Sequence, residues 1–473
     1  MGTGEHGNTR QGLQHRDAWH AWCDFDATGA TDGTGATDER GMGADSRGFL
    51  ERRVKVTWPT RGRGRRGFGK IVVALAVVAI AAATLSPNLG PRSYATIACI
   101  VCGERGWADA VVNVILFMPL GIGLALASVR ARHALLIGAL LSALVELAQL
   151  TVIAGRDPSI GDVLFNAIGA WLGAGLVFLA LEVTRMDGRS AARLSVAAAL
   201  DLSLAVLATG WLMQPSFPRT AYWGQWTPNL GHLEWYRGKV QAATIAGREV
   251  RSRRIAESGW VRDTLLAGGR IEVVATAGPP VPALASLFSI FDVNQQGIII
   301  LGPDRDDLVL WYRTHSTAWR LDQPDIRLGG GWGAPLLGSR ITVSAWAPSP
   351  GTWCLVGPAD RTCEAGFTLG HGWGLLFYAE SFPPWLRSLL AVGWVAVLTI
   401  TTGFLLRRRW ESAVALVIAL AALAVLPGLV DLRPTPVLEF AGAGLGLALG
   451  ALAGWTLRTE VGGAPPAPVQ AFD

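Results

Sequence analysis

Hydrophobic residues in this chain gather in long stretches that contain almost no charged residues. A helix needs about 20 apolar residues to cross the hydrocarbon core of a bilayer, and several stretches reach that length. We therefore predict a polytopic α-helical membrane protein with eight spans, over residues 71–87, 110–128, 133–153, 162–183, 194–213, 386–406, 412–430 and 436–457. The chain is 51% hydrophobic and 16% charged. Soluble domains have about 25% charged residues, so the composition agrees with membrane insertion.

Basic residues lie before the first predicted span and then at every second connection. With eight spans, the segment 52–70 shares one side with four later basic groups, at 130–133, 185–193, 407–409 and Arg458. The positive-inside bias makes that side cytoplasmic. We expect a bacterial plasma-membrane protein with both termini cytoplasmic and residues 214–385 outside. The net charge of +5 follows from these loops, so a nucleic-acid partner is not expected.

The spans divide the chain into a membrane core and a separate outer domain. Residues 1–66 are rich in Gly, Thr, Asp and His near the start, which predicts a disordered cytoplasmic tail. Whether residues 1–41 are translated is left open, with Met42 as an alternative start. The other expected parts are the membrane core 67–213, the outer domain 214–385, the last three spans in 386–457 and a second tail, 458–473.

Residues 214–385 contain short β-branched and aromatic runs that are separated by turn-forming residues about every ten positions. The clearest runs are 270–276, 285–291, 297–301, 307–312 and 340–346. This rhythm predicts an antiparallel all-β sandwich. Cys354 and Cys363 flank a Gly-Pro-Ala-Asp turn, which would place them opposite each other across a hairpin. We expect a disulfide there, with two buried thiols as the alternative. Cys99 and Cys102 are interpreted as a disulfide or an incidental pair.

Polar residues inside three consecutive spans fall at one depth, near the outer side. Asp109 and Asn113 are on the second span, Ser142, Glu146 and Gln149 on the third, and Asp162 and Asn166 on the fourth. Such residues are costly in a bilayer and face a bundle interior or a water-filled cavity. We therefore predict a polar pocket that opens outward, with ligand binding or chemistry as its role. The alternative is that these groups only join the helices by hydrogen bonds.

Four further residues shape the predicted pocket. Arg156, in the loop between the third and fourth spans, is the expected counter-ion of Glu146 or Asp162. Gly169 and Gly173 would let the fourth helix pack closely on a neighbour. Pro119 is expected to interrupt the second helix.

These positions carry a resemblance to a known family. The motifs are Asn113-x3-Phe117-x-Pro119-x-Gly121, Ser142-x3-Glu146-x2-Gln149 and Gly155-Arg156-x5-Asp162-x3-Asn166-x2-Gly169-x3-Gly173. Over about residues 71–183 the chain resembles the VanZ-like membrane protein family, whose name comes from a protein associated with low-level resistance to teicoplanin. The resemblance implies that Asp109, Asn113, Glu146, Gln149, Arg156, Asp162 and Asn166 are the family's polar positions. It does not imply what they do.

The outer domain resembles, more loosely, the concanavalin A-like sandwiches of the laminin-G type, through residues 285–292 and 308–313. That resemblance implies sugar binding, sometimes with calcium. The domain is rich in tryptophan, whose ring can stack on a sugar, although core packing is the better expectation for any single one. Asp292, Asn294, Asp304, Asp306 and Asp307 could supply oxygen ligands, but turn formation is the preferred role because no cation-loop spacing is present. No metal and no cofactor are predicted.

Three functions remain open at this stage. The first is a non-enzymatic envelope protein that binds a glycan or a lipid-linked envelope component, with a link to glycopeptide resistance of the teicoplanin type. The second is a membrane-embedded enzyme acting on a lipid-linked envelope substrate, with Glu146 or Asp162 as acid or base and Arg156 as an anion clamp. The third is a transporter, which the apolar cytoplasmic halves of spans two to four disfavour.

Overall fold

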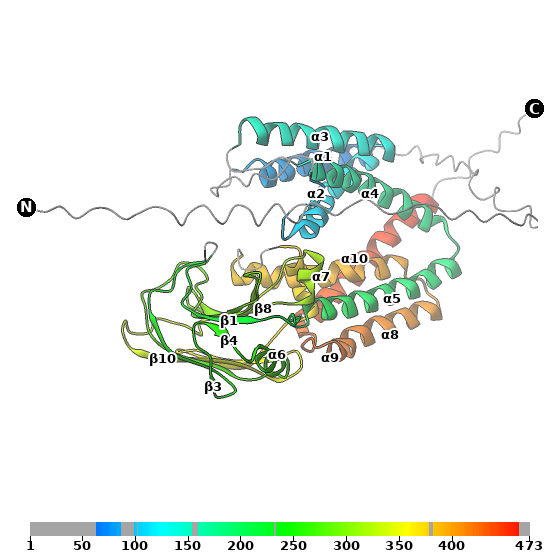
Figure 1. The fold of residues 1–473 in the computed structure, drawn as a ribbon. Coiled ribbons are helices and arrows are strands. Elements are labelled where there is room, and N and C mark those ends of the chain that lie inside the picture. The colour runs from blue at the N-terminus through cyan, green and yellow to red at the C-terminus, as the bar shows by residue number, and fades with distance from the viewer. Residues whose placement is uncertain are drawn as a thin grey trace, which may run out of the picture. The chain divides into compact units, whose positions relative to one another are not determined.

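The protein combines apolar helices with two antiparallel β-sheets (Figure 1). The computed structural model describes residues 63–86, 99–101, 103–153, 159–230, 233–377 and 382–462. All of these belong to one compact unit. Most of the two predicted tails, together with Cys102 and Arg156, lies outside the described residues.

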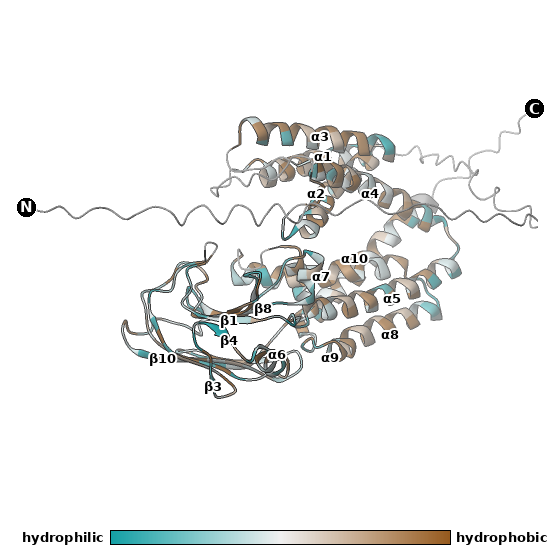
Figure 2. Ribbon diagram, viewed as in Figure 1, coloured by the Kyte–Doolittle hydropathy of each residue, from teal (hydrophilic) through white to brown (hydrophobic). Residues whose placement is uncertain are grey.

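Seven of the described helices are long and apolar enough to cross a membrane. These are α1 (Arg63–Thr84), α2 (Gly106–Leu126), α3 (Ala131–Thr151), α4 (Ile160–Arg185), α5 (Gly188–Met213), α7 (Pro384–Leu405) and α10 (Val437–Gly462). Figure 2 shows hydrophobic residues along these helices and hydrophilic residues toward several of their ends. Helices of this length and composition indicate a multi-pass membrane protein.

The seventh predicted span, 412–430, is not a single long helix. It consists of α8 (Trp410–Ala424), which is 15 residues long, and the short α9 (Leu426–Leu429). Pro427 accounts for the break, because a proline disfavours helical geometry in the residue before it and supplies no N–H. The predicted span 412–430 is therefore divided into two helices, and only seven of the described helices have the length to cross a membrane.

The pair α8–α9 nevertheless connects the same two ends of the molecule as α5. At one end, a Cβ added to Gly188 would lie 3.3 Å from Nε of Arg409, which precedes α8. At the other end, Gln214 Nε2, just after α5, donates to Oδ2 of Asp431, just after α9, at 2.9 Å. The chain thus returns through α8 and α9 to the end of α5 where the β domain begins.

The helices expose large apolar side chains outward and pack through small residues. On α3, Leu136, Leu140 and Leu144 are each more than half exposed, as a lipid-facing helix requires. Close packing joins α2 to α4, where a Cβ on Gly169 would lie 2.3 Å from the Val114 carbonyl oxygen and one on Gly173 would lie 2.1 Å from that of Met118. This close approach of α4 to a neighbour was predicted. The interruption at Pro119 was not correct, since α2 continues through it.

The β domain is built of two six-stranded antiparallel sheets, stacked face to face (Figure 1). The first has the order β4-β1-β6-β7-β8-β9 and the second β12-β11-β10-β5-β2-β3. The strands are β1 (Tyr222–Trp226), β2 (Lys239–Ile245), β3 (Arg248–Glu249), β4 (Arg254–Ile255), β5 (Ile271–Thr276), β6 (Phe288–Phe291), β7 (Gly297–Asp304), β8 (Asp307–Tyr312), β9 (Ile326–Leu328), β10 (Arg340–Ser349), β11 (Thr352–Val356) and β12 (Arg361–Ala365). The helices of this domain are α6 (Ser258–Leu266), η2 (His315–Trp319) and η3 (Leu369–Leu375).

Alternating side chains from the two sheets form the core of this domain. On β5, Ile271, Val273 and Ala275 are buried, and Ile290 and Leu310 approach from the other sheet in the same apolar cluster. The five predicted runs coincide with β5, β6, β7, β8 and β10, which confirms an antiparallel β domain. Cys354 of β11 and Cys363 of β12 are joined by a disulfide.

Candidate functional site

The predicted polar residues of α2, α3 and α4 are drawn together mainly as pairs that link two helices. Between α2 and α4, Asn113 Nδ2 donates to Asp162 Oδ1 at 2.7 Å. Between α3 and α4, Asn166 Nδ2 donates to Ser142 Oγ at 2.9 Å, and both side chains are buried. The polar cluster, as we call Asn113, Ser142, Glu146, Asp162 and Asn166, therefore spans three helices.

Glu146 of α3 contacts the start of α4. Its Oε2 accepts the backbone N–H of Ser159 at 2.9 Å. The Ser159 hydroxyl caps α4 by accepting the N–H of Gly161 at 3.0 Å, and it donates to the carbonyl of Cys99 at 3.2 Å. Because a helix N-terminus carries partial positive charge, a carboxylate is stabilised at this place. Cys99 itself is disulfide-bonded.

Two of the predicted residues lie apart from these pairs. Gln149 is buried and its Nε2 donates to the carbonyl of Thr84 at the end of α1, at 2.9 Å. Asp109 is exposed on the first turn of α2, with the positive charge of Arg105 nearby. Arg156, the expected counter-ion, lies outside the described residues.

One acceptor of the cluster has no donor among the described residues. Oδ1 of Asn166 is buried and makes no hydrogen bond in that part of the chain. A buried polar atom without a partner costs about 1–3 kcal/mol. This one acceptor is suited to a ligand that brings a hydroxyl or N–H donor.

The β domain contacts the helix bundle at the start of α2. Arg105, just before α2, forms an ion pair with Asp322 of the segment after η2, with Nη2 and Oδ2 2.5 Å apart. In the same segment the Arg320 carbonyl accepts the N–H of Ala108 at 3.3 Å, and Arg320 Nη1 donates to the carbonyl of Val101 at 3.2 Å. We refer to these contacts of Arg105, Arg320 and Asp322 as the docking contact.

Burial sets the electrostatics of the docking contact. Desolvation raises the pKa of Asp322, while the positive charge of Arg105 opposes that change. The partially buried guanidinium of Arg105 is therefore needed to hold a charged carboxylate here. Arg105 of the docking contact lies about two helical turns before Asn113, so the β domain and the polar cluster both contact the first half of α2.

Sequence reasoning missed the docking contact because Arg105 and Asp322 are 217 positions apart. One signal was nevertheless present. Arg105 is a basic residue in a loop on the side that was predicted to be poor in basic residues.

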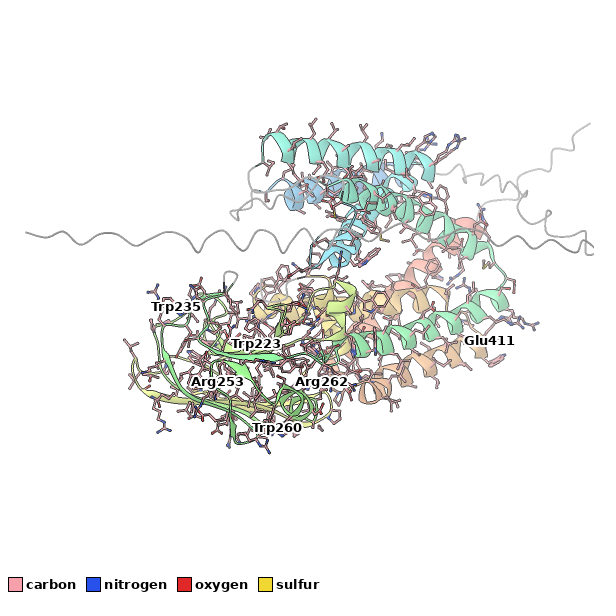
Figure 3. The ribbon with its side chains drawn as sticks, in the orientation of Figure 1. Trp223, Trp235, Arg253, Trp260, Arg262 and Glu411 are labelled. Atoms are coloured by element: carbon pink, nitrogen blue, oxygen red, sulfur yellow. A yellow bond between two sulfur atoms is a disulfide. The ribbon has the colours of Figure 1, made fainter. Side chains whose placement is uncertain are left out.

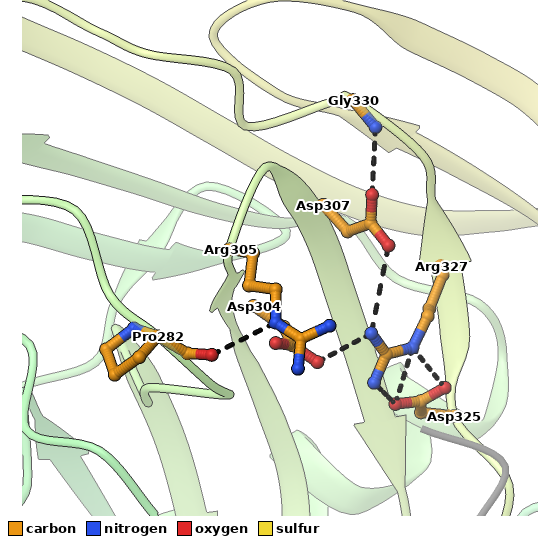
Figure 4. A network of polar contacts seen from close by, with 7 residues as sticks. All are labelled: Pro282, Asp304, Arg305, Asp307, Asp325, Arg327 and Gly330. Carbon is orange, nitrogen blue, oxygen red and sulfur yellow. Dashed lines mark hydrogen bonds and ion pairs between the residues drawn. The ribbon is translucent and has the colours of Figure 1, made fainter. Parts of the chain in front are cut away.

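The acidic residues of the β domain serve ion pairs and turns. Asp292 Oδ1 accepts the backbone N–H groups of Asn294 and Gln296, and its Oδ2 pairs with Arg313. Figure 4 shows Arg327 between Asp304 and Asp325, with Asp307 also within ion-pair distance. The guanidinium occupies the centre of this carboxylate group. No set of metal-ligating side chains is found among the described residues.

Many tryptophans of the β domain are buried or covered by other side chains. Trp332, Trp353 and Trp373 are buried. Guanidinium groups cover two others, since Arg248 lies 4.4 Å from the ring centroid of Trp260 and Arg270 lies 4.7 Å from that of Trp346. Two tryptophans of the domain are more than half exposed, Trp319 beside the docking contact and Trp235, which is labelled in Figure 3.

Comparison with known proteins agrees with the placement of the polar cluster. Residues 68–181 match the model of the VanZ/LLP1 family, and this range includes the whole cluster and less than half of the chain. No curated protein and no solved structure matches the chain. The chain therefore carries a VanZ-like domain formed by α1 to α4.

Proposed function

We propose that this protein is a bacterial plasma-membrane protein of the cell envelope that binds a lipid-linked envelope glycan. In this proposal the β domain recognises the glycan, and the polar cluster engages the polar head of the lipid. The observation that carries it is the ion pair between Arg105 and Asp322, because it holds a β domain beside the VanZ-like cluster. One amphiphilic molecule could then contact both.

The proposed orientation follows from the basic ends of the helices. Arg185, Arg189 and Arg193 surround the start of α5, and Arg407 to Arg409 precede α8, at the ends farthest along these helices from the β domain. Positive residues favour the cytoplasmic side. This supports cytoplasmic termini and a β domain outside the cell, where envelope glycans are found.

Sugar binding by the β domain is supported by Trp235. Its side chain is 52% exposed, and the neighbouring Glu234 and Arg237 are also exposed. An aromatic ring can stack on the apolar face of a sugar while the flanking charged groups hydrogen-bond to its hydroxyls. We propose that these three residues form the glycan contact.

Lipid-head binding by the polar cluster is supported by one buried acceptor. The Oδ1 of Asn166 has no donor among the described residues. A hydroxyl or amide N–H of the ligand head would supply the missing donor. The VanZ-like domain further supports a role in resistance to glycopeptide antibiotics of the teicoplanin type.

The proposal can be tested by binding to the full-length protein in detergent. The probe is a short-chain polyprenyl-diphosphate-linked glycan, and the variants are Trp235→Ala for the β domain and Glu146→Ala for the cluster. Trp171→Ala is the matched control, because Trp171 is 47% exposed on α4 and takes no part in either site. We expect each site variant to bind about tenfold more weakly, equivalent to about 1.4 kcal/mol, with the control unchanged.

Two results would count against the proposal. Absence of binding by the wild-type protein would exclude a lipid-linked glycan as the ligand, especially if Glu146→Ala also leaves teicoplanin sensitivity of the cells unchanged. If the wild-type protein converts the probe to a product and Glu146→Gln does not, the protein is an enzyme and not only a binding protein.

A further inference from the structure

Two arginines meet where α7 and α10 end, away from the β domain. Arg407 follows α7, and its Nη1 donates to the carbonyls of Phe404 at 3.2 Å and Leu406 at 2.9 Å. A Cβ added to Gly454 of α10 would lie 2.6 Å from the Phe404 carbonyl oxygen and 2.8 Å from Nη1 of Arg458. The two guanidinium groups therefore lie beside the same carbonyl, in space that a side chain at position 454 would fill.

Each guanidinium has a buried N–H group without an acceptor. Nη2 of Arg407 and Nη1 of Arg458 are both buried and make no hydrogen bond among the described residues. Leaving a charged donor buried and unpaired costs more than the roughly 1–3 kcal/mol of a neutral group. Burial, and then the positive charge of Arg458, lowers the pKa of Arg407, so the two charges also repel each other.

No carboxylate among the described residues compensates these charges. Glu411, at the start of α8 and labelled in Figure 3, is buried, but its Oε2 has no hydrogen-bond partner there and it forms no ion pair in that part of the chain. Two converging donors with two positive charges require an anion that has several acceptor oxygens. A phosphate group satisfies this requirement, because guanidinium groups bind phosphate oxygens with matched geometry.

The surroundings place these donors at the surface of a membrane. Trp410 at the start of α8 and Trp455 on α10 are 73% and 58% exposed, and tryptophan concentrates at the membrane–water interface. Arg408 and Arg409 are exposed beside them and add positive potential. Basic pockets between helix ends on the cytoplasmic side are suited to the head groups of anionic lipids.

We propose that Arg407 and Arg458 form a binding site for the phosphate of an anionic phospholipid head group. One phosphate oxygen accepts from Nη2 of Arg407 and another from Nη1 of Arg458, which pairs both buried donors and relieves their repulsion. The lipid would then fasten α7 to α10 at this end. This site is separate from the polar cluster and does not depend on the function proposed for it.

The test uses delipidated full-length protein in a neutral detergent, titrated separately with phosphatidylglycerol, phosphatidylcholine and inorganic phosphate. Lipid adducts are counted by native mass spectrometry, and the melting temperature is followed in parallel. The double variant Arg407→Gln/Arg458→Gln removes the site. The variant Arg408→Gln/Arg409→Gln removes the same charge from exposed neighbours and serves as the matched control.

We expect phosphatidylglycerol to bind and stabilise the wild-type protein more than phosphatidylcholine does. The site variant should bind it about tenfold more weakly, and the control should stay within about twofold of the wild type. If inorganic phosphate stabilises the wild-type protein as much as phosphatidylglycerol, and only the site variant loses that effect, the ligand is free phosphate. Equal loss in the two double variants, or equal binding of the two lipids, would overturn the proposal. Should the double variant not fold, the single variants Arg407→Gln and Arg458→Gln must each weaken binding more than Arg408→Gln.

Discussion

At the scale of single residues, polar groups within the spans are paired across helix boundaries. Asn113 donates to Asp162, and Asn166 donates to Ser142. Hydrogen bonds of this kind in membrane proteins contribute about 0.6 kcal/mol on average, and up to about 1.7 kcal/mol. The Asn113–Asp162 bond should lie in the upper part of this range because its acceptor is a carboxylate.

Replacing Asn113 by Leu should therefore destabilise the protein by about 1–2 kcal/mol, because Asp162 would lose a donor from α2. Thermal unfolding of the detergent-purified protein, followed by circular dichroism, measures the change. Thr151→Ala is the control, since the Thr151 hydroxyl bonds within its own helix and is exposed. An unchanged melting temperature in Asn113→Leu would show that the bond does not join α2 to α4.

Helical spacing was enough to predict which polar residues share a face, but not which of them pair. The pairing depends on how far α4 approaches α2, and the contacts at Gly169 and Gly173 set that distance. Asp109 was expected in the same group, but it lies one turn nearer the end of α2, beside Arg105. The ion pair of Arg105 with Asp322 depends on the docking of two domains, which no local pattern encodes.

At the scale of elements, the long apolar stretches predicted most of the helices, and the short β-branched runs between turn residues predicted the main strands. The break between α8 and α9 was missed because residues 412–430 are apolar almost throughout. Apolar length alone does not reveal that Pro427 ends the helix. Short edge strands such as β3 and β4 were also missed, since two residues carry too little pattern. The hairpin β11–β12 was foreseen because its turn residues and cysteine spacing are local.

Removing the disulfide of this hairpin should destabilise the β domain. The disulfide closes a short loop and so limits the conformational entropy of the unfolded chain. The Cys354→Ser/Cys363→Ser variant lacks this constraint, which should lower the free energy of unfolding by about 2–3 kcal/mol. Denaturant unfolding of the full chain, followed by tryptophan fluorescence, should show a lower midpoint than the wild type. Treatment of the wild-type protein with a reductant should reproduce the shift, and the variant, which keeps the disulfide of Cys99, should respond less.

The helix η3 should make stability sensitive to acid. Nδ1 of His371 accepts the backbone N–H of Thr368 at 3.0 Å, so this nitrogen must be unprotonated. Desolvation, and then the charges of Arg433 and Arg387, lowers the pKa of His371 from 6.5 to about 4. Because the unfolded chain binds the proton first, the contribution is present above pH 6.5 and is lost as the pH falls toward 4.

His371→Gln keeps an acceptor at this position but does not titrate. The melting temperature of the wild type should therefore fall more steeply than that of His371→Gln when the pH is lowered from about 7 to about 4.5. Identical slopes for the two proteins would mean that His371 is not held neutral by this hydrogen bond.

At the scale of the whole molecule, the β domain and the VanZ-like domain are connected through few side chains. The ion pair of Arg105 with Asp322 is the strongest of the described contacts between them, and burial of Asp322 makes the pairing charge necessary. Removing only Arg105 should cost about 3–5 kcal/mol if the carboxylate stays buried and charged, and less if the domains separate. Arg105→Ala should thus loosen the docking contact without unfolding either domain.

The central claim is that one lipid-linked glycan contacts the β domain and the polar cluster together. The most direct test compares wild-type protein and Arg105→Ala for binding of the intact polyprenyl-diphosphate-linked glycan and of the glycan alone. The account predicts that Arg105→Ala binds the intact molecule at least about tenfold more weakly, while its affinity for the free glycan is unchanged. Equal affinity of the two proteins for the intact molecule would contradict it.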